Sequence, residues 1–201
     1  MSPAATGRPG RPAASTREAA LELARKRFLA CERVDVQAIA RELGLARATM
    51  HRWFQTRELL LGEVLGSLAE ERLLVIREEV GGSGAPALLE TLHRFNCEIA
   101  ATRGMRALFA QEQERALRLL TSSAGTVEPR VVAIIERLID AEVQNGSFVA
   151  PTPPAVLAYA IVRLGEAFLY NDALAGIRGD TERLHQVEAA LLGAGAGADA
   201  L

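Results

Sequence analysis

The stretch from Val36 to Phe54 constrains this chain more than any other, because it predicts two short amphipathic helices joined by a tight turn. Gly44 stands at the junction, where glycine readily adopts the positive φ that ends a helix. Apolar side chains at helical spacing face a common core from both helices: Ile39, Ala40, Leu43, Leu45 and Met50. The pattern is that of a helix-turn-helix.

The second helix of the pair directs a different set of side chains outward: Arg47, Ala48, Thr49, His51 and Arg52. Such a helix fits the major groove of double-stranded DNA, where Arg binds guanine bidentately and Thr contacts a thymine methyl. We predict that these five residues, together with Arg57, bind DNA. The alternative is an ordinary helix pair whose arginines form a solvated face.

Charge placement favours DNA binding. Residues 1–57 carry eleven Arg and Lys against five Asp and Glu, whereas residues 58–201 carry twelve against twenty. A basic N-terminal quarter on an acidic protein suits contact with a polyanion at one end. Within residues 1–15, a repeated Gly-Arg-Pro predicts a disordered basic arm, and we expect Arg8 and Arg11 to contact DNA.

The remaining sequence also predicts helices, so we expect an all-α fold. Three N-terminal helices should form a DNA-binding domain over residues 16–56, with Thr16 and Asp35 as caps. An antiparallel helical domain for ligand binding and dimerisation should follow over residues 57–193, and residues 194–201 should form a disordered tail. The expected later helices are 86–102, one or two within 105–121, 129–144, 154–175 and 181–192.

Two further expectations concern the helix after Thr56. Thr56 should cap it, and one apolar stripe should face inward: Leu59, Leu60, Val64, Leu65 and Leu68. The helix should end at residues 81–84, where Gly-Gly-Ser-Gly predicts a flexible break.

Motifs of catalysis are missing from the sequence. There is no HExxH, CxxC or GxSxG pattern and no glycine loop between a strand and a helix, so we predict no enzyme, no cofactor and no metal site. An all-helical enzyme whose groups converge only in three dimensions stays an alternative. Charges interrupt every apolar run before a membrane-spanning length, and the N-terminus has no apolar signal region, so we expect a cytoplasmic protein.

The helix expected at 154–175 is apolar almost all round and carries four polar residues on one face: Tyr159, Arg163, Glu166 and Tyr170. One interpretation is a buried Arg163–Glu166 ion pair that fixes dimer geometry. The other is a ligand pocket with polar groups in an apolar wall. Further candidate pocket residues are Leu92, Phe95, Asn96, Ile99, Phe109, Glu112, Gln113 and Asn171. Asn96 interrupts an inward apolar row and therefore needs a partner.

Several of these motifs occur together in a known order: a first helix from Thr16 to Ala24, Ile39-Ala40, Gly44-Leu45, Arg47-Ala48-Thr49, an aromatic pair ending in Phe54, and Glu58-Leu59-Leu60. This part of the chain resembles the N-terminal domain of TetR-family transcriptional regulators. Segments 118–125, 158–163 and 166–172 are similar to the QsdR-like branch of that family. This chain departs from the family pattern at two positions. Ala46 stands where family members commonly have a capping Ser or Thr, and His51 stands where they commonly have a phosphate-binding Tyr.

The resemblance implies a homodimeric repressor that a small apolar effector releases from a palindromic operator, and the QsdR-like branch implies a lactone or acyl-lactone effector. It also implies that the last two long helices of each subunit form a four-helix dimer interface. Ala158, Gly165 and Ala167 are small enough to allow close approach there. The alternative is a ligand-independent DNA-organising protein, which the Gly-Arg-Pro repeat suggests.

Overall fold

The computed structural model describes residues 16–174 and 180–194, except for the side chains of residues 171–174. Every regular element in these ranges is an α-helix, which confirms the predicted all-α fold. The helices are α1 (Arg17–Leu29), α2 (Val36–Glu42), α3 (Arg47–Phe54), α4 (Arg57–Val80), α5 (Gly84–Ala101), α6 (Arg103–Thr121), α7 (Val127–Gln144), α8 (Pro154–Leu174) and α9 (Thr181–Leu192).

Short polar side chains cap the N-termini of α1, α2 and α4 as predicted. Thr16, Asp35 and Thr56 each accept a hydrogen bond from the backbone N–H three residues further on, at 3.2, 2.7 and 3.1 Å. These bonds satisfy N–H groups that the first turn of a helix leaves without a backbone partner. The predicted arm of residues 1–15 and most of the predicted C-terminal tail lie outside the described residues.

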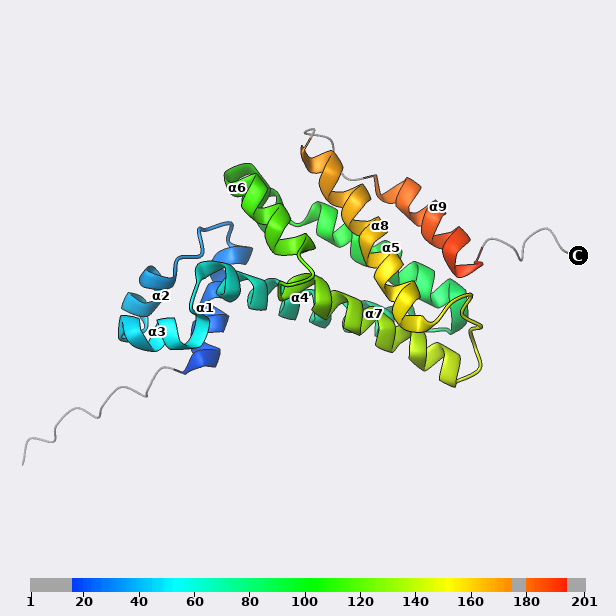
Figure 1. The fold of residues 1–201 in the computed structure, drawn as a ribbon, viewed down its shortest axis with the longest axis horizontal. Helices are drawn as coiled ribbons and strands as arrows, with labels where there is room; N and C mark the ends of the chain where they lie inside the picture. Colours follow the sequence, from blue (N-terminus) through cyan, green and yellow to red (C-terminus); the bar gives the residue numbers. More distant parts are fainter. Residues whose placement is uncertain (1–15, 175–179, 195–201) are drawn as a thin grey trace, which may run out of the picture.

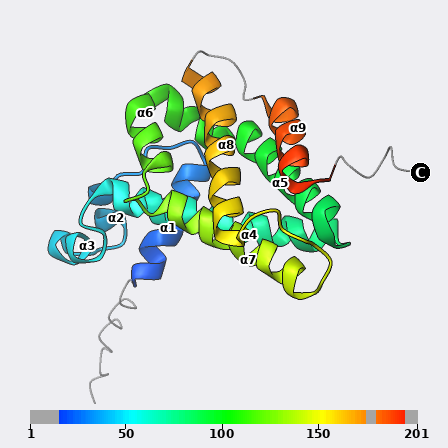
Figure 2. The same cartoon turned by 45° about the vertical axis from the view of Figure 1, so that its right-hand side comes forward.

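The first three helices gather at one end of the molecule, and α4 runs from them into the bundle of the later helices (Figures 1 and 2). In the bundle, α4 packs on α5 and α7, while α8 packs on α7 and α9 on α5. Helix α6 contacts α1, α4 and α8, so it bridges the two parts. Its backbone leaves the helical region at Glu112, where φ is −145° and ψ is 49°.

Two apolar clusters form the core. The first lies beneath α1–α3, includes Ile39, Met50 and Phe54, and continues through α4 to Leu108 on α6 and Val127 on α7. The second lies among α4, α5, α7, α8 and α9. The prediction that Leu59 of α4 faces inward is wrong, since its side chain is 36% exposed. The buried face of α4 is centred instead on Leu60, Leu61, Val64 and Leu65.

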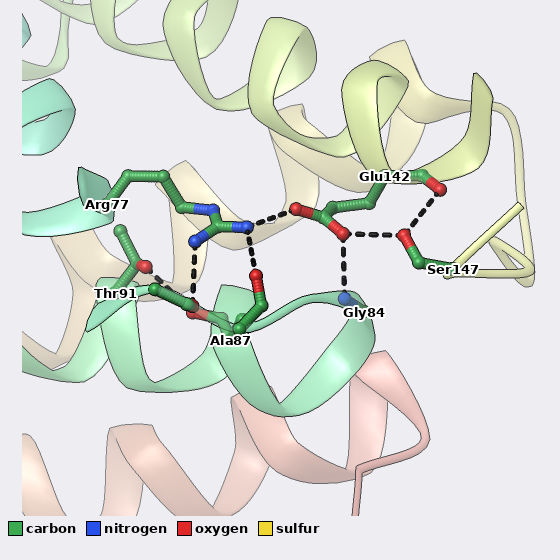
Figure 3. A network of polar contacts seen from close by, with 8 residues as sticks. Arg77, Gly84, Ala87, Thr91, Glu142 and Ser147 are labelled. Carbon is green, nitrogen blue, oxygen red and sulfur yellow. Dashed lines mark hydrogen bonds and ion pairs between the residues drawn. The ribbon is translucent and has the colours of Figure 1, made fainter. Parts of the chain in front are cut away.

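The glycine-serine segment at residues 81–84 is anchored, contrary to the predicted flexible break. Glu142 of α7 is buried and accepts hydrogen bonds from the Gly84 N–H at 2.7 Å and the Ser147 hydroxyl at 2.6 Å (Figure 3). Arg77 of α4 pairs with Glu142 and donates to the carbonyl of Gly81 at 2.9 Å. Burial tends to raise the pKa of Glu142, but these hydrogen bonds and Arg77 lower it below its ordinary value.

Candidate DNA interface and effector cavity

Helix α3, the second helix of the predicted helix-turn-helix, presents its polar face to solvent at the end of the molecule that is farthest from α9 (Figure 1). Arg47, Ala48, His51 and Arg52 are exposed and Thr49 is half-buried. Met50 and Phe54 fix the opposite face, because each is 1% exposed in the core. Five of the predicted DNA-binding residues therefore lie together on a helix that is free to enter a groove.

The turn before α3 is built as the sequence predicts. Gly44 has a φ of +63°, and the N–H of Leu45 donates to the carbonyl of Ala40 at 2.8 Å. Ala46 provides no side-chain cap, but its carbonyl accepts from the N–H of Thr49 at 3.0 Å. The half-buried Leu45 packs against the core and holds the start of α3 in place.

His51 has a hydrogen bond that bears on its predicted phosphate contact. Its Nδ1 lies 3.0 Å from the carbonyl oxygen of Gln55. A carbonyl only accepts, so Nδ1 carries the hydrogen, and the neutral ring then has no N–H on Nε2. A hydrogen bond from His51 Nε2 to phosphate consequently requires the protonated imidazole.

Arg57 lies apart from the exposed set, and its contact with DNA stays a prediction. Its guanidinium donates to the carbonyl of Val34 and to Glu112 Oε2, the latter at 2.8 Å, and its side chain is only 17% exposed. Arg33 also approaches Glu112, at 3.8 Å. These ion pairs join the three-helix end to the kink of α6. Arg8 and Arg11 lie outside the described residues.

A cavity of about 340 Å³ lies between the later helices and α1. Six of the predicted ligand-binding residues line it: Leu92, Phe95, Asn96, Ile99, Glu166 and Tyr170. Its other walls are mainly apolar and include Leu65, Leu68, Met105 and Ile161. This volume falls at the lower end of the range for small-molecule sites in proteins.

The other predicted ligand-binding residues lie elsewhere. Phe109 packs its ring on Tyr170, with centroids 5.5 Å apart, behind the cavity wall. Tyr159 is 46% exposed and lies beneath the guanidinium of Arg163 on the outer side of α8. Glu112 belongs to the ion pairs described above, Gln113 is exposed, and the side chain of Asn171 lies outside the described set.

Sequence reasoning missed Glu128 and Glu188, which are 3% and 1% exposed and line the cavity. Each had a detectable signal. Glu188 lies midway between the buried Leu184 and Leu192 at spacings of four, and Glu128 precedes Val131 by three positions on the inward face of α7. A charged residue within an inward apolar row needs a partner or a function.

Asn96 finds the partner that its position required. Its amide nitrogen donates to both carboxylate oxygens of Glu188, at 3.1 and 3.2 Å. Burial raises the pKa of Glu188 to about 7, although the hydrogen bond from Asn96 opposes the rise. Near neutral pH, this carboxyl group therefore lies close to its point of half-ionisation.

The predicted Arg163–Glu166 pair forms, but it is buried on one side only. Arg163 Nη1 lies 2.7 Å from Glu166 Oε2, with the Arg163 side chain 42% exposed and that of Glu166 11% exposed. Burial raises the pKa of Glu166, Arg163 lowers it, and the negative charge of Glu128 raises it again. The interpretation of a fully buried ion pair is therefore wrong: Glu166 lies on the cavity wall, and its counter-ion Arg163 lies on the outer side.

Helix α1 also contributes to the cavity wall, through Arg25, Phe28 and Leu29. Ala20 and Ala24 of the same helix are buried in the core that holds α2 and α3. Phe28 also closely approaches Gly104 at the start of α6, where a Cβ would lie 2.7 Å from the Phe28 carbonyl oxygen. A molecule in the cavity would consequently touch the helix that supports the DNA-reading pair.

Comparison with known protein families gives a match over residues 83–193, to the family described as tetracyclin repressor-like, C-terminal domain. The match covers more than half of the chain. The chain belongs to the TetR family of transcriptional regulators. TetR-family proteins are DNA-binding transcription factors, so this chain is a regulator and not an enzyme.

Solved TetR-family structures share the fold. The transcriptional repressor QsdR of R. erythropolis is 28% identical, with a TM-score of 0.82 over 88% of this chain and 94% of its own. The repressor AlkX of Dietzia sp. strain DQ12-45-1b, implicated in biodegradation of n-alkanes, is 22% identical, with a TM-score of 0.59 over 90% of this chain and 99% of its own. At that identity the likeness to AlkX concerns the fold alone. No curated protein matches the chain.

The small residues proposed for a TetR-type dimer contact do not share one face of α8. Ala158 is fully buried, and Gly165 lines the cavity, where an added Cβ would meet no atom within 4 Å. Only Ala167 is exposed. None of the described helices is long and apolar enough to cross a membrane.

Proposed function

We propose that this TetR-family regulator is a homodimeric repressor that a small molecule releases from DNA by binding in the cavity. The observation that carries the proposal is the shared wall: Phe28 and Leu29 of α1 line the same cavity as α5, α7, α8 and α9. A ligand that contacts both parts can favour one placement of the DNA-reading helices over another.

Dimerisation is proposed through the outer faces of α8 and α9. Val156 and Tyr159 of α8 are 54% and 46% exposed, and Val187 of α9 is 38% exposed. The two helices pack on each other, so their outer faces offer an apolar surface for a second copy. Two recognition helices related by a twofold axis would then reach successive major grooves about 34–36 Å apart.

Two contacts are proposed to transmit occupancy to the DNA-reading end. One is the cavity wall of α1, and the other is the Arg57–Glu112 pair at the kink of α6, whose Met105 and Leu120 also line the cavity. To act as a switch, the effector must favour the released state by about 1–3 kcal/mol. Glu112, predicted as a ligand contact, is thus proposed as a coupling residue.

The effector is proposed to be a small, largely apolar molecule, because the walls offer apolar side chains and few polar atoms. The lactone or acyl-lactone class implied by the QsdR-like resemblance stays a prediction. Partners beyond the effector are a second copy of the chain and a palindromic DNA operator, and the expected location is the cytoplasm.

Selection of genomic fragments by the purified chain, followed by footprinting and sedimentation, tests the proposal. We expect one protected palindrome bound by a dimer. Uniform protection of unrelated DNA would instead support the DNA-organising alternative. Binding of single half-sites by a monomer would contradict the dimer.

Gly165→Leu provides a variant with a filled cavity. An added side chain at Gly165 points into open space, so the variant should fold, dimerise and bind the operator like the original chain. Gly165→Ala is the matched control, because it fills little of the cavity. Loss of operator binding in Gly165→Leu alone would show that filling the cavity is enough for release.

A further inference from the structure

Three carboxyl groups of the later helices line the mainly apolar cavity. Glu128, Glu166 and Glu188 line it from α7, α8 and α9. Glu188 is partnered by Asn96, whose amide donates to both of its oxygens. The other two carboxyl groups lack such a partner on one oxygen each.

Glu128 is the more deeply buried of these two residues. The residue is 3% exposed, and its Oε2 accepts no hydrogen bond from any residue that the structure describes. The same holds for Glu166 Oε1. Glu128 also lies in the first turn of α7, where the helix dipole favours a negative charge. A buried acceptor without a donor is costly, so this pair of oxygens requires an explanation.

The neighbouring cations do not balance these acids. Arg163 is bound to Glu166 from the outer side of α8 and also donates to the Thr121 carbonyl at 3.1 Å. Arg25 and Arg72 line the cavity, but their guanidinium groups pair with carboxylates of Glu71 and Glu98. Among the residues that the structure describes, Glu128 and Glu166 therefore share one half-exposed counter-ion, Arg163.

We propose that the effector carries a protonated amine on an apolar body and that its ammonium group binds between Glu128 and Glu166. An ammonium presents N–H donors and a positive charge to the two unpartnered oxygens. Apolar residues such as Leu68, Phe95 and Ile161 line the rest of the cavity and suit a hydrocarbon chain. This inference rests on the proposed effector function of the cavity and narrows the chemistry of its ligand.

A lactone is the opposite chemical case. Its ring oxygen and carbonyl are acceptors, so it supplies no donor to carboxylate oxygens and leaves them unpaired. The two ligand classes therefore make opposite demands on the same acids. Substitution of Glu by Gln tests which demand the cavity meets, because it removes the charge of the acid and keeps the size of its side chain.

The test is calorimetric titration of the full chain with n-octylamine, 1-octanol and γ-octalactone, which have equal carbon counts. We expect n-octylamine to bind at least about tenfold more tightly than the other two. Glu128→Gln and Glu166→Gln should each weaken n-octylamine binding about tenfold and leave 1-octanol binding unchanged. Glu182→Gln, at an exposed position of α9, is the matched control and should change neither.

The outcomes separate this inference from the function on which it rests. If γ-octalactone or 1-octanol binds as tightly as n-octylamine, and Gly165→Leu blocks that binding, the cavity is an effector site but the amine class is wrong. Equal losses for n-octylamine and 1-octanol in the Gln variants would likewise overturn the ammonium contact. If none of the three probes binds, the effector function of the cavity itself is contradicted.

Discussion

Replacement of Glu188 by Gln should stabilise the protein above neutral pH. The carboxyl group is 1% exposed, and burial raises its pKa from the ordinary 4.5 to about 7. Between these two values the folded chain holds a proton that the unfolded chain has released. Stability therefore falls as the pH rises from 4.5 to 7 and stays reduced above 7.

The size of the effect follows from the shift. At about 1.4 kcal/mol for each pH unit, the raised pKa corresponds to about 3 kcal/mol of lost unfolding free energy above pH 7. Glu188→Gln removes the ionisation, and its side-chain oxygen can still accept from Asn96. The variant should thus equal the original chain in stability under acid conditions and exceed it by about 3 kcal/mol above neutrality.

Urea denaturation of the two proteins over a series of pH values measures this difference directly. The comparison between them cancels the other titrating groups, including Glu166, whose pKa is also raised by burial. Glu182→Gln on the same helix serves as the exposed control. Equal stability of Glu188→Gln and the original chain at every pH would refute the claim that Glu188 is buried with its charge uncompensated.

Three further outcomes are expected. Arg47→Ala should weaken binding to the operator by about 1–3 kcal/mol and to random duplex much less, as measured by fluorescence anisotropy, and equal losses would remove Arg47 from the base-reading set. Tyr159→Asp should place a charge in the proposed dimer surface and yield monomers in sedimentation, whereas an intact dimer would show that this surface is misplaced. Glu142→Gln should lower the free energy of unfolding by about 2–3 kcal/mol at neutral pH, because it weakens the contacts to Arg77 and Gly84. This loss should shrink as the pH falls below 4.5. The pKa of Glu142 is lowered in the folded chain, so the stability that its charge adds disappears in acid. A deficit that is the same at all pH values would show that the charge of Glu142 adds no stability.

Local signals in the sequence predicted most of the fold. Caps such as Thr16 and Asp35 act through their own neighbours, and Gly44 needs only its own backbone freedom. Helical periodicity likewise placed Ile39 and Met50 inward and Arg47 outward. These features depend on spacing along one helix, which the sequence displays directly.

The cavity was only partly predictable, because its walls come from helices distant in sequence. Asn96 was identified by its break in an apolar row, yet its partner Glu188 lies on another helix. Tyr159, Arg163 and Glu166 share one face of α8 as predicted, but only Glu166 lines the cavity, whereas Tyr159 is 46% exposed. No local pattern shows which neighbouring helix covers which part of a given helix. For this reason Arg163 was expected to be buried, whereas its side chain is half-exposed.

Arg57 illustrates the same limit at the DNA-reading end. A basic residue just beyond the recognition helix is a reasonable phosphate ligand, but the kink of α6 brings Glu112 to it. The ion pair between them is a long-range contact that depends on how α6 crosses α4. Arg57 and Glu112, predicted as a DNA contact and a ligand contact, thus form an ion pair between the two parts of the chain, and we propose that this pair couples them.

The most direct test of the account is the operator affinity of the original chain and of Gly165→Leu, each measured with and without saturating n-octylamine or γ-octalactone. We predict that at least one of these ligands weakens operator binding of the original chain by about fivefold or more and has no effect on Gly165→Leu. Unchanged operator affinity while calorimetry shows the cavity of the original chain to be occupied would contradict the claim that this cavity controls DNA binding.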